Sequence, residues 1–142
     1  MSLALDGSTT LAWIYPDEIS DATERILALV TESGAWVTSI WRMEVANGLQ
    51  TGIRRGRIDT TYRDAALSDL TLLDIAVDPD TDRYAWTSTS AWLVGSDAAY
   101  LELAQRRSLP LASLDLALCE AARALGVDSV ATWGDALSGI RR

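Results

Sequence analysis

The sequence predicts an α/β fold: a three-layer α/β/α sandwich around a central, mainly parallel sheet of four or five strands. Three observations predict it. Short apolar runs of strand length alternate with longer stretches of helical periodicity, glycine and proline separate them, and 49% of the residues are hydrophobic. Strands that alternate with helices form a parallel sheet covered on both faces. The 142 residues contain no internal repeat, linker or low-complexity tract, so we expect a single domain over residues 1–142.

The expected elements follow one another in a regular order along the chain. Apolar, β-prone runs predict strands at residues 3–5, 35–38, 74–77 and 111–114, with a fifth edge strand at 129–131. Helical spacing predicts helices near residues 9–15, 21–33, 40–54, 60–72, 80–93, 96–107 and 115–125. Ser8 or Thr9 can cap the first helix, and Asp21 with Glu24 resembles a capping box at the second.

The charged residues limit the chemistry that this chain can perform. It carries 20 acidic and 12 basic residues, and this net charge of −8 argues against a broad nucleic-acid-binding surface. All the basic residues are arginine, and the absence of histidine removes the commonest general base and the imidazole metal ligands. Any chemistry must therefore use carboxylates, hydroxyls and a hard metal ion.

Cysteine content and hydropathy predict the compartment. The single cysteine, Cys119, cannot form an internal disulfide and fits a reducing environment. No apolar run approaches the ~18 residues that a membrane span needs. The N-terminus has no basic region followed by an apolar stretch, so no signal peptide is expected. We therefore expect a cytoplasmic protein with no membrane partner.

Four carboxylates, Asp6, Glu44, Asp97 and Asp115, stand where apolar strands or helix faces end. Asp6 and Asp115 directly follow expected strands, and Glu44 and Asp97 fall in the first turns of expected helices. Because the carboxyl ends of parallel strands meet at one edge of the sheet, all four can converge there. Two carboxylates ~4 Å apart repel by about 4 kcal/mol at an effective dielectric near 20, so such a cluster needs protons or a cation. Oxygen ligands without Cys or His favour Mg²⁺ or Mn²⁺.

Each acid also has a purely structural explanation. Asp6 and Asp115 can be helix N-caps, and Asp97 is favourable near the positive end of a helix dipole. Glu44 is harder to explain in this way because its neighbours on the helix are apolar, although it can also be partly solvated. Taken singly, the three aspartates favour the structural explanation, whereas the shared edge favours a common function.

Four segments of the chain resemble the PIN domain, and more narrowly the VapC ribonuclease toxins of bacterial toxin–antitoxin pairs. They contain the four acids in family-like order and spacing: LDGS at residues 5–8, WRMEVANGL at 41–49, SDAAYLELA at 96–104 and LPLASLD at 109–115. The resemblance spans nearly the whole chain. It implies an α/β/α sandwich, Mg²⁺-dependent endonucleolytic cleavage of RNA, and inhibition by a VapB-like antitoxin. Members of this family commonly form homodimers.

The resemblance also implies a role for each acid. Asp6 and Asp97 would bind Mg²⁺ directly, and Asp115 would bind it directly or through water. Glu44 would orient or deprotonate the attacking water, since no histidine can do so.

Small polar residues near the acids match the family as well. Those that would hold the carboxylates are Ser8, Asn47 and Ser113. The chain departs from the family at Gly7, where Thr or Ser is more usual, and at Ser96, where a bulkier residue often stands. Ala117 and Leu118 replace an extra acid that some relatives carry, which leaves the choice between one and two metal ions open.

Two further groups of residues are candidates for partner contacts. Basic side chains should flank an acidic site that takes RNA, and the candidates are Arg42, Arg54, Arg55 and Arg57. A solvated helix end is the simpler explanation of the last three. The aromatic residues beside the acidic edge are Trp13, Tyr15 and Trp41, for which core packing is the default explanation. The resemblance adds an alternative, a groove for an antitoxin helix that would place an arginine among the acids.

Two other functions remain open. A receiver-like signalling domain also gathers carboxylates and Mg²⁺ at strand ends. It normally needs a lysine on its last strand and paired acids after its first, whereas this chain has no lysine and has Gly7 after Asp6. A catalytically silent PIN fold that acts as a binding module is the third hypothesis, and the presence of all four acids argues against it.

Overall fold

The computed structural model describes residues 2–86 and 96–130. They form a four-stranded parallel sheet flanked by helices, which confirms the expected α/β/α sandwich. The strands are β1 (Leu3–Leu5), β2 (Ala35–Val37), β3 (Ile75–Val77) and β4 (Leu111–Ala112). The helices are α1 (Gly7–Ile14), α2 (Asp21–Ser33), α3 (Trp41–Arg54), α4 (Thr60–Leu70), α5 (Thr81–Ala85), α6 (Ser96–Arg106) and α7 (Leu116–Ala124), with a 3₁₀ turn, η1, at Pro16–Glu18.

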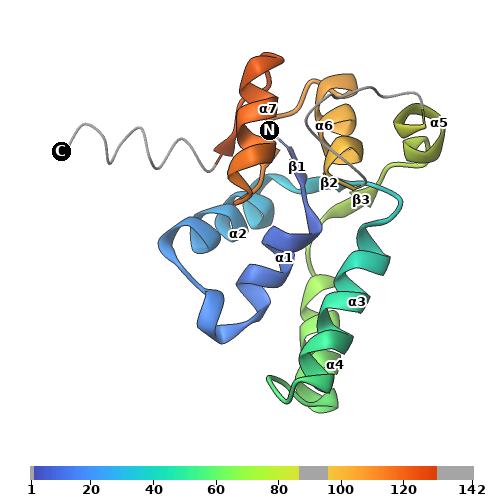
Figure 1. Ribbon diagram of the computed structural model, residues 1–142. Helices are drawn as coiled ribbons and strands as arrows, with labels where there is room; N and C mark the ends of the chain where they lie inside the picture. Colours follow the sequence, from blue (N-terminus) through green and yellow to red (C-terminus); the bar gives the residue numbers. More distant parts are fainter. Residues whose placement is uncertain (1, 87–95, 131–142) are drawn as a thin grey trace.

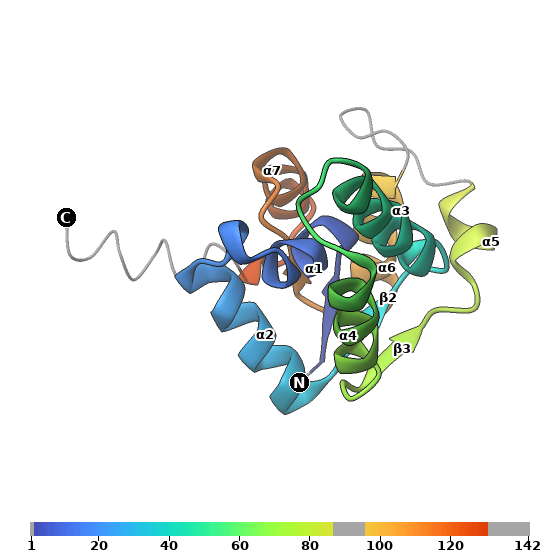
Figure 2. The same cartoon turned by 90° about the horizontal axis from the view of Figure 1, so that it is seen from below.

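The strand order is β3-β2-β1-β4, and every neighbouring pair runs parallel. The chain advances stepwise from β1 to β3 and then crosses back to β4. Right-handed crossovers therefore place α1 to α4 on one face and α5 and α6 on the other. In agreement, α6 packs on β1 and β4, whereas α1 packs on α2 and α3. Figure 1 shows α5, α6 and α7 at the top of the view and α3 and α4 at the bottom, and Figure 2 looks at α3 and α4 from below.

Helix ends follow local hydrogen bonding that differs from the expectation by one or two residues. Asp6, and not Ser8 or Thr9, caps α1, because its carboxylate accepts the Thr9 backbone N–H. The capping box of α2 is formed by Ser20 and Thr23 instead of Asp21 and Glu24. In both cases the true cap is the last extended residue before the helix, which hydropathy patterns do not mark.

Gly34 makes the turn from α2 into β2 possible. Its φ of 75° lies in the region that other residues rarely adopt, and a Cβ there would lie 2.9 Å from the backbone oxygen of Asp74. A side chain would therefore push β2 away from the segment that leads into β3. This glycine lets the second and third strands come together.

The largest differences from the expected elements lie in the second half of the chain. The helix expected at 80–93 is α5, which ends at Ala85, and residues 87–95 lie outside the described part. The segment expected as a fifth strand makes one isolated parallel bridge, between Leu111 and Ser129. Residue 131 of that segment is also outside the described part. Short elements depend on tertiary partners more than on local propensity, so patterns overestimate their length.

The hydrophobic core lies between the sheet and the helices on each face. Its fully buried members come from strands and helices alike, including Leu5, Val37, Leu49, Leu103, Leu111 and Leu118. Burying one such side chain contributes about 1.5–3 kcal/mol, so this core fixes the sheet to which the loops are attached. Of the helices in the described ranges, none combines the length and hydrophobicity that crossing a membrane requires.

Candidate functional site

The structure brings the four acids singled out in the sequence to one region. Asp6 directly follows β1, and Asp115 follows β4 by three residues. Glu44 lies in the first turn of α3, which comes after β2, and Asp97 lies in the first turn of α6. The carboxylates are close enough to influence one another, because each of the other three raises the pKa of Asp97.

Asp6 is the most buried of the four, with 3% of its surface exposed. Its Oδ1 accepts hydrogen bonds from the Thr9 backbone N–H at 2.8 Å and from the Ser8 hydroxyl at 3.3 Å. Its Oδ2 accepts a hydrogen bond from the Ser113 hydroxyl at 2.6 Å. Burial raises the pKa of Asp6, and these hydrogen bonds oppose the rise. Asp6 therefore caps α1 and at the same time belongs to the acidic cluster.

Ser113 connects the ends of β1 and β4. Its buried hydroxyl donates to Asp6 and accepts the backbone N–H of Asp115 at 3.0 Å. Asp115 in turn caps α7, since its Oδ1 accepts the Leu118 N–H at 3.2 Å. One serine hydroxyl therefore hydrogen-bonds to both Asp6 and Asp115, two acids that are far apart in the sequence.

Asp97 differs from these acids in having no compensating contact. Burial raises its pKa, and the negative charges of Asp115, Asp6 and Glu44 raise it further. No hydrogen bond or ion pair reaches its carboxylate from any residue within the two described ranges. It is a partly buried acid surrounded by like charges.

Glu44 is enclosed by two contacts that the sequence does not indicate. The hydroxyl of Tyr100 donates a hydrogen bond to its Oε1. Gly7 lies on another side, where a Cβ would approach the Glu44 Cβ to 3.0 Å and Oε1 to 3.2 Å. A side chain at position 7 would therefore crowd Glu44.

Tyr100 is a site residue that sequence reasoning missed. It is 1% exposed, and burial together with the hydrogen bond to Glu44 raises the pKa of its hydroxyl well above the ordinary value. Thr38, which follows β2, lies beside it. The Thr38 hydroxyl interacts with that of Tyr100 without the geometry of a hydrogen bond, and it has no other partner in the described part of the chain.

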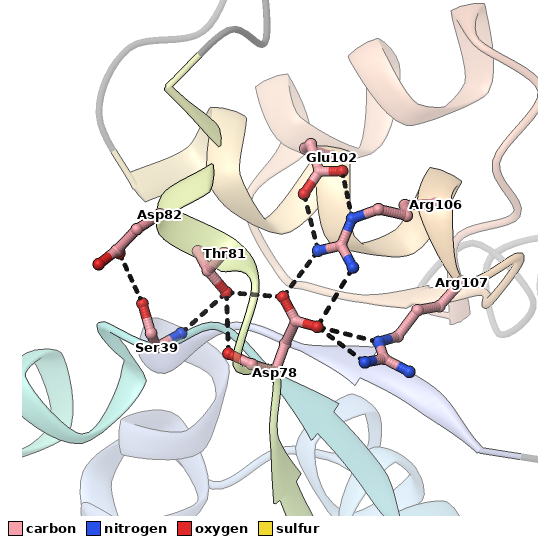
Figure 3. A network of polar contacts seen from close by, with 7 residues as sticks. All are labelled: Ser39, Asp78, Thr81, Asp82, Glu102, Arg106 and Arg107. Carbon is pink, nitrogen blue, oxygen red and sulfur yellow. Dashed lines mark hydrogen bonds and ion pairs between the residues drawn. The ribbon is translucent and has the colours of Figure 1, made fainter. Parts of the chain in front are cut away.

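A second group of charges shows how this fold neutralises a buried acid. Asp78 follows β3, and its side chain is fully buried between Arg106 and Arg107 of the end of α6, at 2.6 and 2.8 Å (Figure 3). Burial raises its pKa, but hydrogen bonds from the two arginines and Thr81 outweigh this effect and lower it to about 2. Glu102 holds Arg106 from the other side at 2.8 Å. Asp78 is compensated by protein groups, whereas Asp97 is not.

The chemistry of the donor set fits a hard divalent cation. Four carboxylates and two serine hydroxyls supply only oxygen atoms, which suit Mg²⁺ and Mn²⁺. Among the side chains that the structure describes, no group of three or more acids or thiols is arranged so that it could hold a metal ion as it stands. Asp6 accepts three hydrogen bonds within the protein, which leaves about one of the four lone-pair positions of its carboxylate for a metal ion.

The smaller predicted site residues divide into two groups. Ser8 and Ser113 hydrogen-bond Asp6. Asn47 is exposed on α3, and its side chain makes no hydrogen bond to any of the acids in the described ranges. The role of Asn47 stays a prediction that rests on its place three residues after Glu44 on α3.

The predicted RNA-contacting arginines have different surroundings. Arg57 pairs with Asp17 and Glu18 at 2.8 and 3.0 Å and stacks 4.0 Å above the ring of Tyr15. The other three are exposed and form no ion pair within residues 2–86 and 96–130: Arg42, Arg54 and Arg55. A surface pocket of about 250 Å³ between α1 and α3 has Ser8 in its lining together with Arg55 and Arg57.

The three predicted groove aromatics do not share one groove. Trp13 lines a pocket of about 430 Å³ beside α4, and Trp41 lines another of about 460 Å³ between α3, α4 and β3. Tyr15 is 3% exposed and donates to the backbone oxygen of Gly48 at 2.7 Å. Trp41 is 6% exposed and donates to Thr10 at 3.0 Å. Tyr15 and Trp41 therefore have mainly packing roles in the structure.

The chain is similar in structure to PAE2754 from Pyrobaculum aerophilum, a protein known from its crystal structure. The TM-score is 0.66 at 20% sequence identity, and the match covers 97% of this chain and 95% of that chain. No protein-family model matches the sequence, and no curated protein matches it. At this identity the likeness establishes the α/β/α fold alone.

Proposed function

We propose that this protein is a Mg²⁺-dependent endoribonuclease that cleaves RNA at the acidic edge formed by Asp6, Glu44, Asp97 and Asp115. Mn²⁺ fits the same donor set. The observation that carries the proposal is the unneutralised carboxylate of Asp97, whose pKa three other acids raise. In the same fold, buried Asp78 is held by two arginines. An acidic cluster without such partners is suited to bind a divalent cation.

The proposed ligands are Asp6, Asp97 and Asp115. A bound Mg²⁺ would lower the pKa of a water molecule and stabilise negative charge on the scissile phosphate. Ser8 and Ser113 orient Asp6 through the hydrogen bonds already described. Their effect is to aim the carboxylate by restricting rotation about its terminal bond.

Glu44 is the proposed general base. The chain has no histidine, so a carboxylate is the available group that can accept a proton from the attacking water. Glu44 is partly exposed, and its one hydrogen bond within the described part of the chain engages Oε1. The remaining oxygen can therefore accept that proton.

The arginines of α3 are proposed to guide RNA to the acids. Arg55 lies 11 residues after Glu44 on or just beyond the same helix, about 16 Å along its axis at 1.5 Å per residue. Exposed Arg42, Arg54 and Arg55 offer phosphate contacts that balance the repulsion of RNA by the acids. Arg57 is the weaker candidate because Asp17 and Glu18 already neutralise it.

We also propose that the enzyme acts in the cytoplasm as a homodimer and is inhibited by a cognate VapB-like antitoxin. The pockets beside α4 support the antitoxin as a partner. They are lined by apolar residues from several elements, including Trp13 in one and Trp41 in the other. An apolar helix face can dock in such grooves while an arginine from the same partner pairs with the acids.

A cleavage assay with matched acid variants tests the proposed activity. End-labelled mixed RNA is incubated with the purified protein in Mg²⁺, and then in EDTA. We expect the wild-type protein to produce fragments with Mg²⁺ and none with EDTA. Asp97→Asn and Asp6→Asn should produce no fragments even with Mg²⁺. Glu32→Gln neutralises an exposed acid on α2 and should cleave like the wild type. Full cleavage by either aspartate variant would contradict the site.

The same assay distinguishes the silent binding module. One observation favours this alternative: both oxygens of the Asp6 carboxylate accept hydrogen bonds from protein groups, one of them as the cap of α1. A silent module predicts that no RNA fragment appears under any metal condition, while an RNA or protein partner still binds. The receiver-like alternative predicts phosphorylation of an aspartate by acetyl phosphate.

A further inference from the structure

Tyr100 and Glu44 form the one direct hydrogen bond between α6 and an acid on α3 in the described part of the chain. They lie 56 residues apart in sequence, and the tyrosine hydroxyl donates to Oε1 of the glutamate. Tyr100 follows Asp97 by three residues on α6, so both side chains project from the same side of the helix. One helix therefore supplies an acid to the cluster and a hydrogen-bond donor to another acid.

The hydroxyl of Tyr100 keeps the proton that it donates to Glu44. Its side chain is 1% exposed, and burial together with the contact to Glu44 raises its pKa, so it stays protonated at neutral pH. Water cannot readily replace Glu44 as its acceptor, because the site of the hydroxyl is enclosed. A buried hydroxyl without a hydrogen-bond partner costs about 1–3 kcal/mol of folding free energy, so the hydrogen bond to Glu44 is strongly favoured.

Gly7 also restricts Glu44. Its missing side chain leaves a space in which the glutamate packs, with only 3.0 Å between an added Cβ and the Glu44 Cβ. The carboxylate thus contacts both a hydrogen-bond donor and the backbone at Gly7. This arrangement fixes Oε1 and leaves the other oxygen of Glu44 without a hydrogen bond in the described ranges.

The helix that carries Tyr100 is itself fixed at its far end. Arg106 and Arg107 bind the buried Asp78 at the end of β3, and Glu102 supports Arg106 (Figure 3). Rotation of α6 about its axis would break these ion pairs. The position of the Tyr100 hydroxyl relative to α3 is therefore determined by the sheet.

We propose that Tyr100 is a positioning residue for Glu44, holding Oε1 so that the other carboxylate oxygen faces the attacking water. This inference rests on the proposed nuclease function and adds to it a residue outside the acidic set. Tyr100 acts through Glu44 and does not touch the substrate. Its ring packs in the core, so the experiment must separate the hydroxyl from the ring.

The test compares Tyr100→Phe with Tyr62→Phe. Each variant removes one hydroxyl and keeps the ring, and Tyr62 is a matched control because its hydroxyl donates to the backbone oxygen of Ile14, away from the acids. We expect kcat for RNA cleavage to fall about 10- to 100-fold in Tyr100→Phe, with KM unchanged, as for other groups that orient catalytic side chains. Tyr62→Phe should keep the wild-type kcat.

A second readout needs neither metal nor RNA. The chain has six glutamates, so carboxyl ¹³C labelling of glutamate gives few signals, and Glu44→Gln assigns the one that belongs to Glu44. At constant pH 7 in metal-free buffer, the Glu44 signal should shift in Tyr100→Phe and stay in place in Tyr62→Phe. Gly7→Ala, which leaves Tyr100 intact and displaces Glu44, should shift it as well and serves if Tyr100→Phe fails to fold.

The two readouts separate the inference from the function on which it rests. An unshifted Glu44 signal in Tyr100→Phe overturns the inference, and so does a wild-type kcat in that variant. If the wild-type protein cleaves no RNA but the signal shifts, the contact is established and the nuclease proposal fails. A fall in kcat that is equal in Tyr100→Phe and Tyr62→Phe would assign the effect to stability, which also overturns the positioning role.

Discussion

Ser113 donates a buried hydrogen bond of 2.6 Å to Oδ2 of Asp6, across 107 residues of sequence. The contact ties the carboxyl end of β4 to that of β1, so two strand ends that carry acids share one hydroxyl. It also opposes the effect of burial on Asp6, because a hydrogen bond to the ionised carboxylate favours that form.

Replacing Ser113 with alanine should therefore destabilise the protein. The variant leaves a buried carboxylate oxygen without its donor, at a cost of about 1–3 kcal/mol in the free energy of unfolding. Urea denaturation at pH 7 measures this. Ser8→Ala is the control: it removes a longer bond of 3.3 Å to the same carboxylate from an exposed serine, and should change stability by about 0.5 kcal/mol or less. Equal losses in the two variants would contradict this view of Ser113.

The acidic cluster should make the metal-free protein less stable as the pH rises. The folded protein raises the pKa of Asp97 and of Asp6 above the ordinary value of 3.8. Between that value and the raised folded pKa, the folded state binds more protons than the unfolded state. Stability is therefore highest below about pH 4 with respect to these two groups, and falls as the pH rises through their folded pKa values.

Asp97→Asn tests this pH dependence. The variant cannot ionise at position 97 and relieves repulsion among the remaining acids, so it should be more stable than the wild type at pH 7. The difference should shrink as the pH is lowered toward 4. Thermal unfolding in EDTA between pH 4 and pH 7 measures the difference. A variant that is less stable than the wild type at pH 7 would contradict the prediction.

Much of the fold follows from the sequence because strands and helices alternate with clear apolar patterns. The positions of the four parallel strands follow from apolar runs such as Leu3–Leu5 and Ala35–Val37, whereas their register required the structure. The four acids could also be placed, because each follows a strand or opens a helix and parallel topology brings such positions together.

Tyr100 and Asp78 could not be recognised in the same way. A tyrosine within an apolar helix face is ordinarily a core residue, and only the spatial approach of α3 identifies its hydroxyl as a donor to Glu44. Asp78 stands before a proline and resembles a turn residue, while its partners Arg106 and Arg107 lie 28 and 29 residues later. Side-chain pairing over such distances leaves no periodic signal.

Divalent cations should stabilise the protein through the same acids. A ligand that binds only the folded state at 100 times its Kd adds about 2.7 kcal/mol to the free energy of unfolding. Titration with Mg²⁺ or Mn²⁺, followed by thermal unfolding, should raise Tm in the wild type, and EDTA should reverse the change. Asp97→Asn should lose the response and Glu32→Gln should keep it. An equal response in all three proteins would place the cation elsewhere.

Asp78→Asn should be strongly destabilising. The substitution keeps the shape of a fully buried side chain but removes the charge that pairs with Arg106 and Arg107, and breaking a buried pair costs about 3–5 kcal/mol. The pKa of about 2 means that the wild type gains this stability above pH 3.8 and loses it as the pH falls from 3.8 through 2. Chemical denaturation at pH 7 and pH 3 measures both effects. Asp82→Asn, at an exposed acid that accepts from Ser39, should have little effect.

The ion pairs of Asp78 also have a consequence for the rate at which the site is lost. They form only when β3 has paired with β2 and α6 has docked on the sheet, so they are expected on the native side of the folding barrier. Contacts absent from the transition state slow unfolding and leave the folding rate nearly unchanged. The helix that carries Asp97 and Tyr100 is thus retained by a kinetic barrier to opening. Stopped-flow unfolding of Asp78→Asn should show a faster unfolding arm and an unaltered folding arm.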